Sequence, residues 1–362
     1  MRIQQCCVLL LAASAGSATQ AADVTPYGAF NLGLEYRDIQ HNTLQNGDKV
    51  ADHTAIQDYF SFVGLKGEHA LNSDITGFFD YRLSVDTSSG RLEEDTQTVW
   101  AGNGVEENIA YLGVKGIYGQ LSVGTQWNAY WNTISATTDK FSSGWTGFDT
   151  LAGFQLPNLI AYQAPEMGNL SLALNLQVNG AEKDSTSNTP GQKNERKIVA
   201  ARYVMGQHSL GIAFDDLGEG DSQLLGVAWV SNIDALRLAG KAEQIQNGAP
   251  DKNGKTGDGL LISLQAILSY GANRYKIHYA TGDYPVYLPV GEKDASNKGS
   301  EIKLGIDRSI SPQFYIFFEY QQSNDYCAYD LTEGNGNGGY DNVTGNEIYG
   351  CSLFATGAHY SF

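Results

Sequence analysis

Few residues in this chain have the spacing that catalysis or metal binding requires. The segment Asp251–Gly259, DKNGKTGDG, resembles the start of a calcium-binding loop, but position twelve is Ile262 where such a loop needs a bidentate Glu. None of the six histidines pairs at metal-ligand spacing, and no GxSxG turn presents a nucleophilic serine. The glycine run 334–339 precedes no predicted helix that could cradle a phosphate. We therefore expect no enzymatic activity, no bound metal and no cofactor.

Two cysteines, Cys327 and Cys351, are the remaining candidates for covalent chemistry. Residues 1–22 contain Arg2, the apolar run Cys6–Ala13 and then small residues, a pattern typical of a secretory signal peptide. Export would place the chain in an oxidising compartment, where a disulfide between Cys327 and Cys351 would clamp the segment between them. Two unpaired thiols are the alternative.

Charge and hydropathy restrict the partners that the chain can have. The formal net charge is −17 at pH 7, which argues against nucleic acid because nucleic-acid binding needs a basic surface. The mean hydropathy is −0.29. Beyond the signal peptide, no segment approaches the ~18 consecutive apolar residues of a membrane-spanning helix.

The repeating pattern is an alternation of apolar and polar residues, which predicts β-strands with one apolar face. In Ile75–Asp86, for example, Phe79 and Tyr81 alternate with Asp80 and Arg82. Tight turns and long polar connections alternate between such segments, which is typical of an up-and-down antiparallel meander. The sixteen predicted strands cover residues 23–37, 58–67, 74–86, 107–116, 120–127, 158–164, 169–178, 195–205, 208–216, 223–231, 234–245, 259–269, 274–283, 300–308, 313–321 and 349–362.

The orientation of the two faces follows from the number of strands. Sixteen strands closed into one sheet enclose an interior too wide for side chains to fill, so the polar face should line water. Charged residues within the strands would be costly in a soluble core but not along a water-filled lumen. We therefore predict an all-β, 16-stranded antiparallel transmembrane β-barrel over residues 23–362, with a secreted sandwich as the alternative. The charged residues expected on its pore wall are Arg37, Arg82, Arg202, Arg237, Lys276 and Glu319.

Several stretches resemble the general porins of Gram-negative bacteria. DVTPYGAFNLGLEY resembles their opening strand, FSFVGLKGEHALNSDITGFFDYRL their second hairpin, and AYLGVKGIYGQLSVGTQWNAYWNTISATTDKF the strands that lead into their third loop. The resemblance implies a homotrimeric, multi-pass protein of the cell outer membrane, surrounded by lipid and lipopolysaccharide. It implies passive diffusion of small hydrophilic solutes and ions. It also implies that the terminal Phe362 is recognised by the barrel-assembly machinery.

The resemblance further implies that the third long loop, residues 128–157, folds into the lumen and narrows it. Because aromatic rings stack on the apolar faces of sugars, a carbohydrate-selective channel is an alternative function. The rings could instead serve to fix the loop to the barrel wall. The candidate residues at this constriction are Trp127, Tyr130, Trp131, Asp139, Lys140, Phe141, Trp145 and Asp149.

General porins commonly face this loop with wall arginines, and this chain departs from that pattern. The matched positions hold Phe62, Asn108, Gly124-Thr125 and Gln155, which argues against strong charge selection at the constriction and against anion preference. Acidic residues in the expected external loops would enrich cations at the mouth at low salt, so we expect a mild cation preference. These acidic residues are Glu93, Glu94, Asp95, Glu106, Glu107, Asp215, Asp216, Glu219 and Asp221.

Overall fold

Almost every described residue belongs to an antiparallel strand or a turn between strands. The computed structural model describes residues 23–43, 53–88, 91–92, 109–143, 150–178, 196–218, 222–247, 258–283, 298–326 and 347–362. The strands of the first half are β1 Asp23–Thr43, β2 His53–Asp58, β3 Phe62–Ala70, β4 Ile75–Asp86, β5 Arg91–Leu92, β6 Ile109–Gly116, β7 Gly119–Trp127, β8 Gln155–Gln163 and β9 Leu170–Gln177. Those of the second half are β10 Arg196–Met205, β11 His208–Asp216, β12 Gln223–Ile233, β13 Leu236–Gln246, β14 Gly259–Tyr270, β15 Asn273–Asp283, β16 Lys298–Ser309, β17 Phe314–Tyr326 and β18 Glu347–Ser361.

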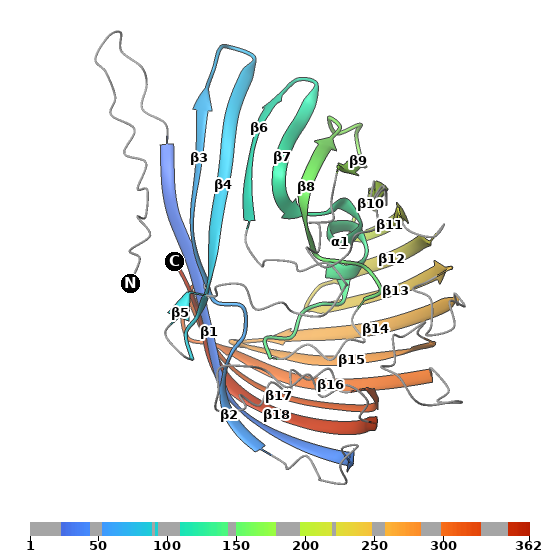
Figure 1. Cartoon of the computed structure of the whole chain (residues 1–362). Helices are drawn as coiled ribbons and strands as arrows, with labels where there is room; N and C mark the ends of the chain where they lie inside the picture. Colours follow the sequence, from blue (N-terminus) through green and yellow to red (C-terminus); the bar gives the residue numbers. More distant parts are fainter. Residues whose placement is uncertain are drawn as a thin grey trace, which may run out of the picture.

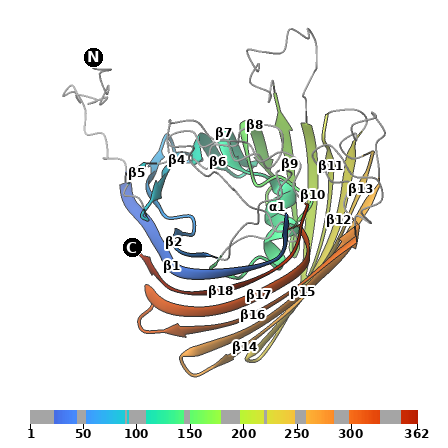
Figure 2. The same ribbon diagram turned by 60° about the horizontal axis from the view of Figure 1, so that its bottom comes forward.

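The strands form one closed ring. Each barrel strand pairs with its neighbour in sequence, and β1 closes the sheet by pairing with β18 (Figure 2). Two strands do not add to the circumference: β2 and β3 are consecutive partners of the same strand β1, and β5 pairs only with the end of β4. The eighteen strands therefore make sixteen barrel positions, which confirms the predicted 16-stranded antiparallel barrel.

The second barrel position differs from its prediction. Sequence alternation predicts one strand over 58–67, whereas the structure breaks it between β2 and β3, where Phe60 has φ 66°. The break turns Tyr59 toward the interior, and its hydroxyl donates a hydrogen bond of 2.8 Å to Glu35. A buried tyrosine needs such a partner, and this contact explains why the alternation is interrupted here.

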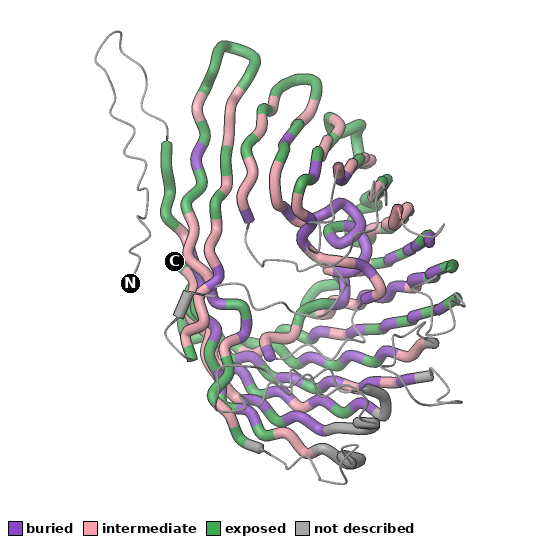
Figure 3. The backbone as a smooth tube through the Cα atoms, in the orientation of Figure 1, coloured by how far each residue is buried: buried purple, intermediate pink, exposed green. Residues whose placement is uncertain are grey.

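Exposure alternates along the strands as Figure 3 shows for β12 to β15. In β12, Leu225, Val227 and Trp229 are exposed on the outside, whereas Leu224 and Ala228 are buried on the inside. The outer surface is therefore apolar, as predicted. The inner face of β12 is also partly apolar, which the alternation does not predict; the reason is the segment that packs against it.

That segment is the connection between β7 and β8, residues 128–154, here called loop 3. It contains the short helix α1, Ala129–Thr133, and the 3-10 helix η1, Ser135–Thr137. Its C-terminal boundary lies three residues before the predicted position 157, because Gln155 already begins β8. No helix in the described part of the chain is long and apolar enough to cross a membrane.

Candidate functional site

Loop 3 begins with a side chain that joins its two ends. Asn128 caps α1 by accepting a hydrogen bond of 2.8 Å from the Trp131 backbone N–H. Its side-chain amide donates to the backbone oxygens of Gly153 and Phe154, at 2.7 and 2.8 Å. The Asn128 side chain therefore provides a hydrogen-bond acceptor at the start of α1 and also holds residues 153–154, at the other end of loop 3, in place.

The helix α1 lies inside the ring of strands and packs against β9 to β12 (Figures 1 and 2). Tyr130 and Ile134 are fully buried there, in one apolar cluster with Leu159, Ile198 and Leu224. The wall provides the space by carrying small residues. A Cβ at Gly226 would lie 2.3 Å from Tyr130 Oη, and one at Gly211 would lie 2.9 Å from Thr133 Cγ2. A side chain at either position would displace the loop.

The aromatic residues at the root of loop 3 contact one another. Trp127 stacks on Trp131 with ring centroids 5.4 Å apart, and Phe154 meets Trp131 edge-on at 4.4 Å. Trp131 is only 6% exposed and Tyr130 is fully buried. Burial also raises the pKa of Tyr130 well above its usual value, and the carboxylates of Glu243 and Asp215 raise it further. Tyr130 and Trp131 therefore pack the loop and present no open face to a solute.

The C-terminal half of loop 3 is attached through Glu319 of β17. The Glu319 carboxylate accepts hydrogen bonds from the backbone N–H groups of Ser142 and Ser143, at 2.9 and 2.7 Å. Lys276 of β15 donates to the same carboxylate at 2.6 Å and to Asp307 at 2.7 Å. All three charged side chains are nearly fully buried. Glu319 and Lys276 therefore hold the loop, Asp307 balances the charge of Lys276, and none of the three is a charge open to the lumen.

A second attachment uses Glu243 of β13, which sequence alternation did not single out. Its carboxylate accepts from Thr150 Oγ1 at 2.8 Å, from the Leu151 N–H at 3.0 Å and from Ser135 Oγ at 3.1 Å. Lys241, two residues earlier on the same face, lies 3.4 Å away. A glutamate on the polar face of a strand is detectable in the sequence, but its loop partners are 92 and more residues away and become visible only in the fold.

Two arginines on the inner wall donate hydrogen bonds to loop 3, whereas Glu243 and Glu319 accept them. Arg202 donates to the backbone oxygen of Asn132, and Arg237 donates to that of Thr137 at 2.6 Å. Backbone carbonyls are neutral, so both guanidinium groups keep their charge. Among the described residues neither arginine pairs with a carboxylate. Both remain partly exposed on the inner face of the barrel.

Lys140 adds a further cation beside these arginines. It is exposed, yet the surrounding barrel partly dehydrates its ammonium group and so lowers the pKa of Lys140. The neighbouring Asp139 raises that pKa in part, while Arg237 and Arg202 lower it. Lys140 and the two arginines therefore place three cationic side chains near one another at loop 3.

The remaining predicted residues are placed as follows. Phe141 lies under two cations, 4.8 Å from Lys276 Nζ and 5.9 Å from Lys303 Nζ. Arg37 pairs with buried Glu35, and Arg82 lies over the ring of Phe62. The other predicted residues lie outside the described residues or side chains: Trp145, Asp149, Cys327, the side chain of Cys351, and the acidic residues Glu93, Glu94, Asp95, Glu106, Glu107, Glu219 and Asp221.

Asp215 is one of the acidic residues predicted to lie in external loops and to enrich cations at the mouth, but its surroundings are not those of an open loop. It is fully buried, and the Arg196 guanidinium forms a bidentate ion pair with its carboxylate. Its negative charge is therefore balanced inside the barrel wall. The prediction that Asp215 contributes to an acidic mouth is wrong for this reason.

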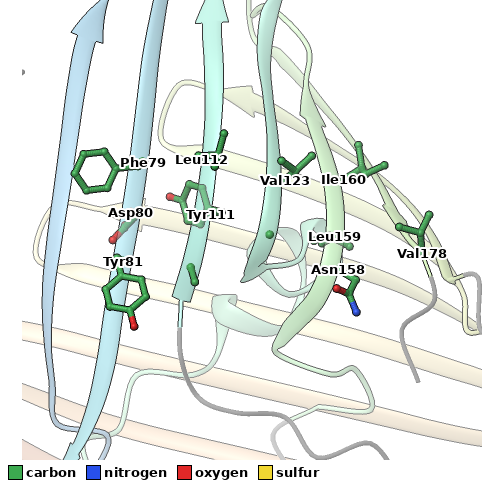
Figure 4. A pocket seen from close by; sticks show the side chains of 12 residues that line it. Phe79, Asp80, Tyr81, Tyr111, Leu112, Val123, Asn158, Leu159, Ile160 and Val178 are labelled. Carbon is green, nitrogen blue, oxygen red and sulfur yellow. The ribbon is translucent and has the colours of Figure 1, made fainter. Parts of the chain in front are cut away.

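The outer surface carries a shallow apolar hollow of about 800 Å³ across β4, β6, β7 and β8. Figure 4 shows Phe79, Leu112, Val123 and Ile160 among the side chains around it. These residues are exposed and alternate with residues of the interior. The hollow therefore belongs to the outer surface and not to the candidate site.

A closed barrel with an apolar exterior and a loop held inside by ionic contacts defines a membrane protein of the β-barrel class. Comparison with known proteins agrees. Residues 8–326 match the family model described as Gram-negative porin, and the chain belongs to that family. It is accordingly an outer-membrane β-barrel.

Individual relatives are distant. The chain is 22% identical over 240 residues to an outer membrane porin protein of Bordetella pertussis, and this match covers 60% of each protein. Among solved structures, an anion-selective porin from Comamonas acidovorans superimposes with a TM-score of 0.67 at 16% identity, over 94% of this chain and all of that one. The trimer form of OmpT from Vibrio cholerae gives 0.60 at 14% identity, over 95% of this chain and all of that one. These structures share the barrel fold.

Proposed function

We propose that this chain forms a water-filled channel for passive diffusion of small hydrophilic solutes and ions, narrowed by loop 3 and without catalytic activity. The main support for this proposal is that loop 3 is hydrogen-bonded to the inner wall at two places, through the carboxylates of Glu243 and Glu319. A loop tied at two strands on the inner face reduces the cross-section of the lumen permanently, because these contacts persist without a solute. A carbohydrate-selective channel is less well supported, since Tyr130 and Trp131 are buried.

Membership of the family supports proposals about partners and processing. We propose a homotrimer in lipid and lipopolysaccharide, as one solved relative is described in a trimer form. We also propose that residues 1–22 are removed on export and that the barrel-assembly machinery recognises Phe362. The terminal residue supports this role because its backbone pairs with Gly28 of β1 at 3.1 Å in both directions, so it completes barrel closure. Its ring is 50% exposed on the outer surface.

The charge of the interior suggests a selectivity that depends on salt. The acidic residues expected in external loops would favour cations at the mouth, but their field would decay over ~10 Å at 0.1 M salt and over ~3 Å at 1 M. Arg202, Arg237 and Lys140 lie at loop 3, where a passing ion must approach them closely. We therefore propose a mild cation preference at low salt and an anion preference at high salt; the latter replaces the expectation from the sequence, which argued against anion preference because it did not identify Arg202 and Arg237 beside loop 3.

Reversal potentials in planar bilayers test this proposal. With a KCl gradient at high mean concentration, the wild-type channel should prefer chloride, and the double variant Arg202→Gln with Arg237→Gln should lose most of that preference. Glutamine can still donate to the loop carbonyls, so the loop should stay in place. Lys197→Gln is the matched control, because Lys197 lies on the same strand but faces outward.

Two results would contradict the proposal. One is cation preference of the wild-type channel at high salt. The other is an equal shift in the double variant and in the Lys197→Gln control, which would mean that overall charge rather than position sets selectivity.

A further inference from the structure

The inner wall formed by β1, β3, β4 and β6 carries aromatic rings next to basic side chains. These strands are neighbours in the barrel. These rings are not in the apolar cluster that holds α1 of loop 3 against β9 to β12. We call this group the wall patch; it consists of Tyr27, Phe62, Phe78, Tyr111, Lys66 and Arg82.

The register places the wall patch on the inner face. Asn31 of β1 donates a hydrogen bond of 2.9 Å to the backbone oxygen of Ser142 in loop 3, so its side chain points inward. Tyr27 lies four residues earlier on the same face of β1, roughly 13 Å along the strand at ~3.3 Å per residue. Directly opposed residues share a face, and the pairs Lys66–Asp80 and Asp80–Tyr111 extend this face across the wall.

The rings are held in defined positions against the wall. A Cβ at Gly64 would lie 2.6 Å from Tyr27 Cε1, and one at Gly113 would lie 2.5 Å from Phe78 Cζ. Both rings therefore occupy space that only glycine leaves open. The Tyr27 hydroxyl donates to Asp80 Oδ1, and Tyr111 lies directly opposite Asp80 on the next strand. Edge-to-face contacts complete the group, with Tyr27 and Phe62 centroids 5.6 Å apart and Phe78 and Tyr111 centroids 6.2 Å apart.

The charge presented beside the rings is positive. Lys66 is exposed, its ammonium lies 5.0 Å from the centre of the Tyr27 ring, and it has no ion-pair partner among the described residues. The Arg82 guanidinium lies 3.8 Å over Phe62. The nearby Asp80 carboxylate accepts a hydrogen bond from Tyr27, and one carboxylate beside the two cations Lys66 and Arg82 leaves the net charge of this region positive. Lys115 on β6, in contrast, is paired with Glu68 at 2.6 Å.

We propose that the wall patch is a binding site within the channel for aromatic carboxylates. The solute ring would pack on the half-buried rings of Phe78 and Tyr111, and its carboxylate would pair with Lys66. Aliphatic carboxylates lack the ring contact, and neutral sugars or alcohols lack the charge contact, so both bind more weakly. The proposal rests on the proposed function, because the site is reached only through a water-filled lumen.

The test uses single-channel recording of the full mature protein at moderate KCl concentration. Benzoate is compared at equal concentration with acetate, which lacks the ring, and with benzyl alcohol, which lacks the charge. Benzoate should reduce or interrupt the KCl current at millimolar concentration, and the other two probes should require at least about threefold more. Lys66→Gln and Phe78→Leu should each weaken the benzoate effect about threefold or more.

Phe79→Leu is the matched control, because Phe79 is the next residue of β4 and faces outward. It should leave the benzoate effect unchanged. If benzoate acts no more strongly than acetate, or if Phe79→Leu changes its action as much as Phe78→Leu, the wall patch is not this site. Lys66→Gln alters an exposed side chain and keeps the test valid if Phe78→Leu fails to fold. Absence of any KCl current would instead refute the proposed channel function.

Discussion

Glu243 and Glu319 lie on different strands, and each accepts hydrogen bonds from a different part of loop 3. Carboxylates suit this task because a backbone N–H that points at an ionised oxygen forms a stronger hydrogen bond than one to a neutral group. Lys241 and Lys276 balance the buried charges. Arg202 and Arg237, in contrast, bind loop 3 through neutral carbonyls and keep partly exposed charges on the inner face. The same residues thus set the loop position and the local field.

Removal of the Glu319 carboxylate should release the Ser142–Ser143 part of loop 3. Glu319→Ala leaves two N–H groups without their acceptor and deprives buried Lys276 of one of its two carboxylate partners. Breaking a buried ion pair costs about 3–5 kcal/mol. We expect a lower temperature for unfolding of the barrel, measured by its mobility on SDS gels after heating, and larger fluctuations of the open-channel current.

The control for this prediction is Glu68→Gln, which removes an exposed ion pair with Lys115. Such surface pairs contribute about 0–1 kcal/mol, so this variant should unfold close to the wild-type temperature. Equal behaviour of the two variants would show that Glu319 does not hold the loop.

At the scale of the elements, alternation was sufficient to predict the strands, since a period of two is a local property of each segment. It failed where a tertiary contact overrides the period. The break at Tyr59 is one case, because the ring turns inward to reach Glu35. The apolar inner face of β12 is another, because Leu224 packs with Tyr130 and Ile134 of loop 3. Neither partner can be identified from the pattern of the strand itself.

Gly124 lies at the irregular end of β7 that leads into loop 3, and its substitution tests whether this backbone geometry is required. It has φ +131°, and a Cβ there would lie 2.1 Å from the backbone oxygen of Ala110. Gly124→Ala should destabilise the barrel by at least about 1 kcal/mol, because the backbone must shift at the β6–β7 pairing. Thermal unfolding of the folded band on SDS gels measures this effect.

Gly77→Ala is the matched glycine control. Its added Cβ would meet Leu71 atoms at 3.5 Å, which is ordinary contact. A similar loss of stability in both variants would mean that strain at Gly124 is not a specific feature of the loop root.

At the scale of the whole molecule, the sequence was enough to predict barrel size, orientation of the faces and family. The interior of the site was less predictable. Ser142 and Glu319 are separated by 177 positions, and only the curvature of a closed ring brings them together. The wall patch was missed for the same reason, since its residues come from four strands. Arg82, Arg202, Arg237 and Lys276 were named as wall charges, but which of them are fastened and which face the lumen depends on loop 3.

The central claim is that a water-filled lumen, narrowed by a permanently fastened loop, passes hydrophilic solutes by size. Swelling of liposomes that contain the purified protein, in isotonic solutions of neutral sugars and polyols of increasing size, tests it most directly. We predict rates that fall smoothly with solute size, whatever the stereochemistry of the solute. No swelling, or rates ordered by chemical identity and not by size, would contradict the account.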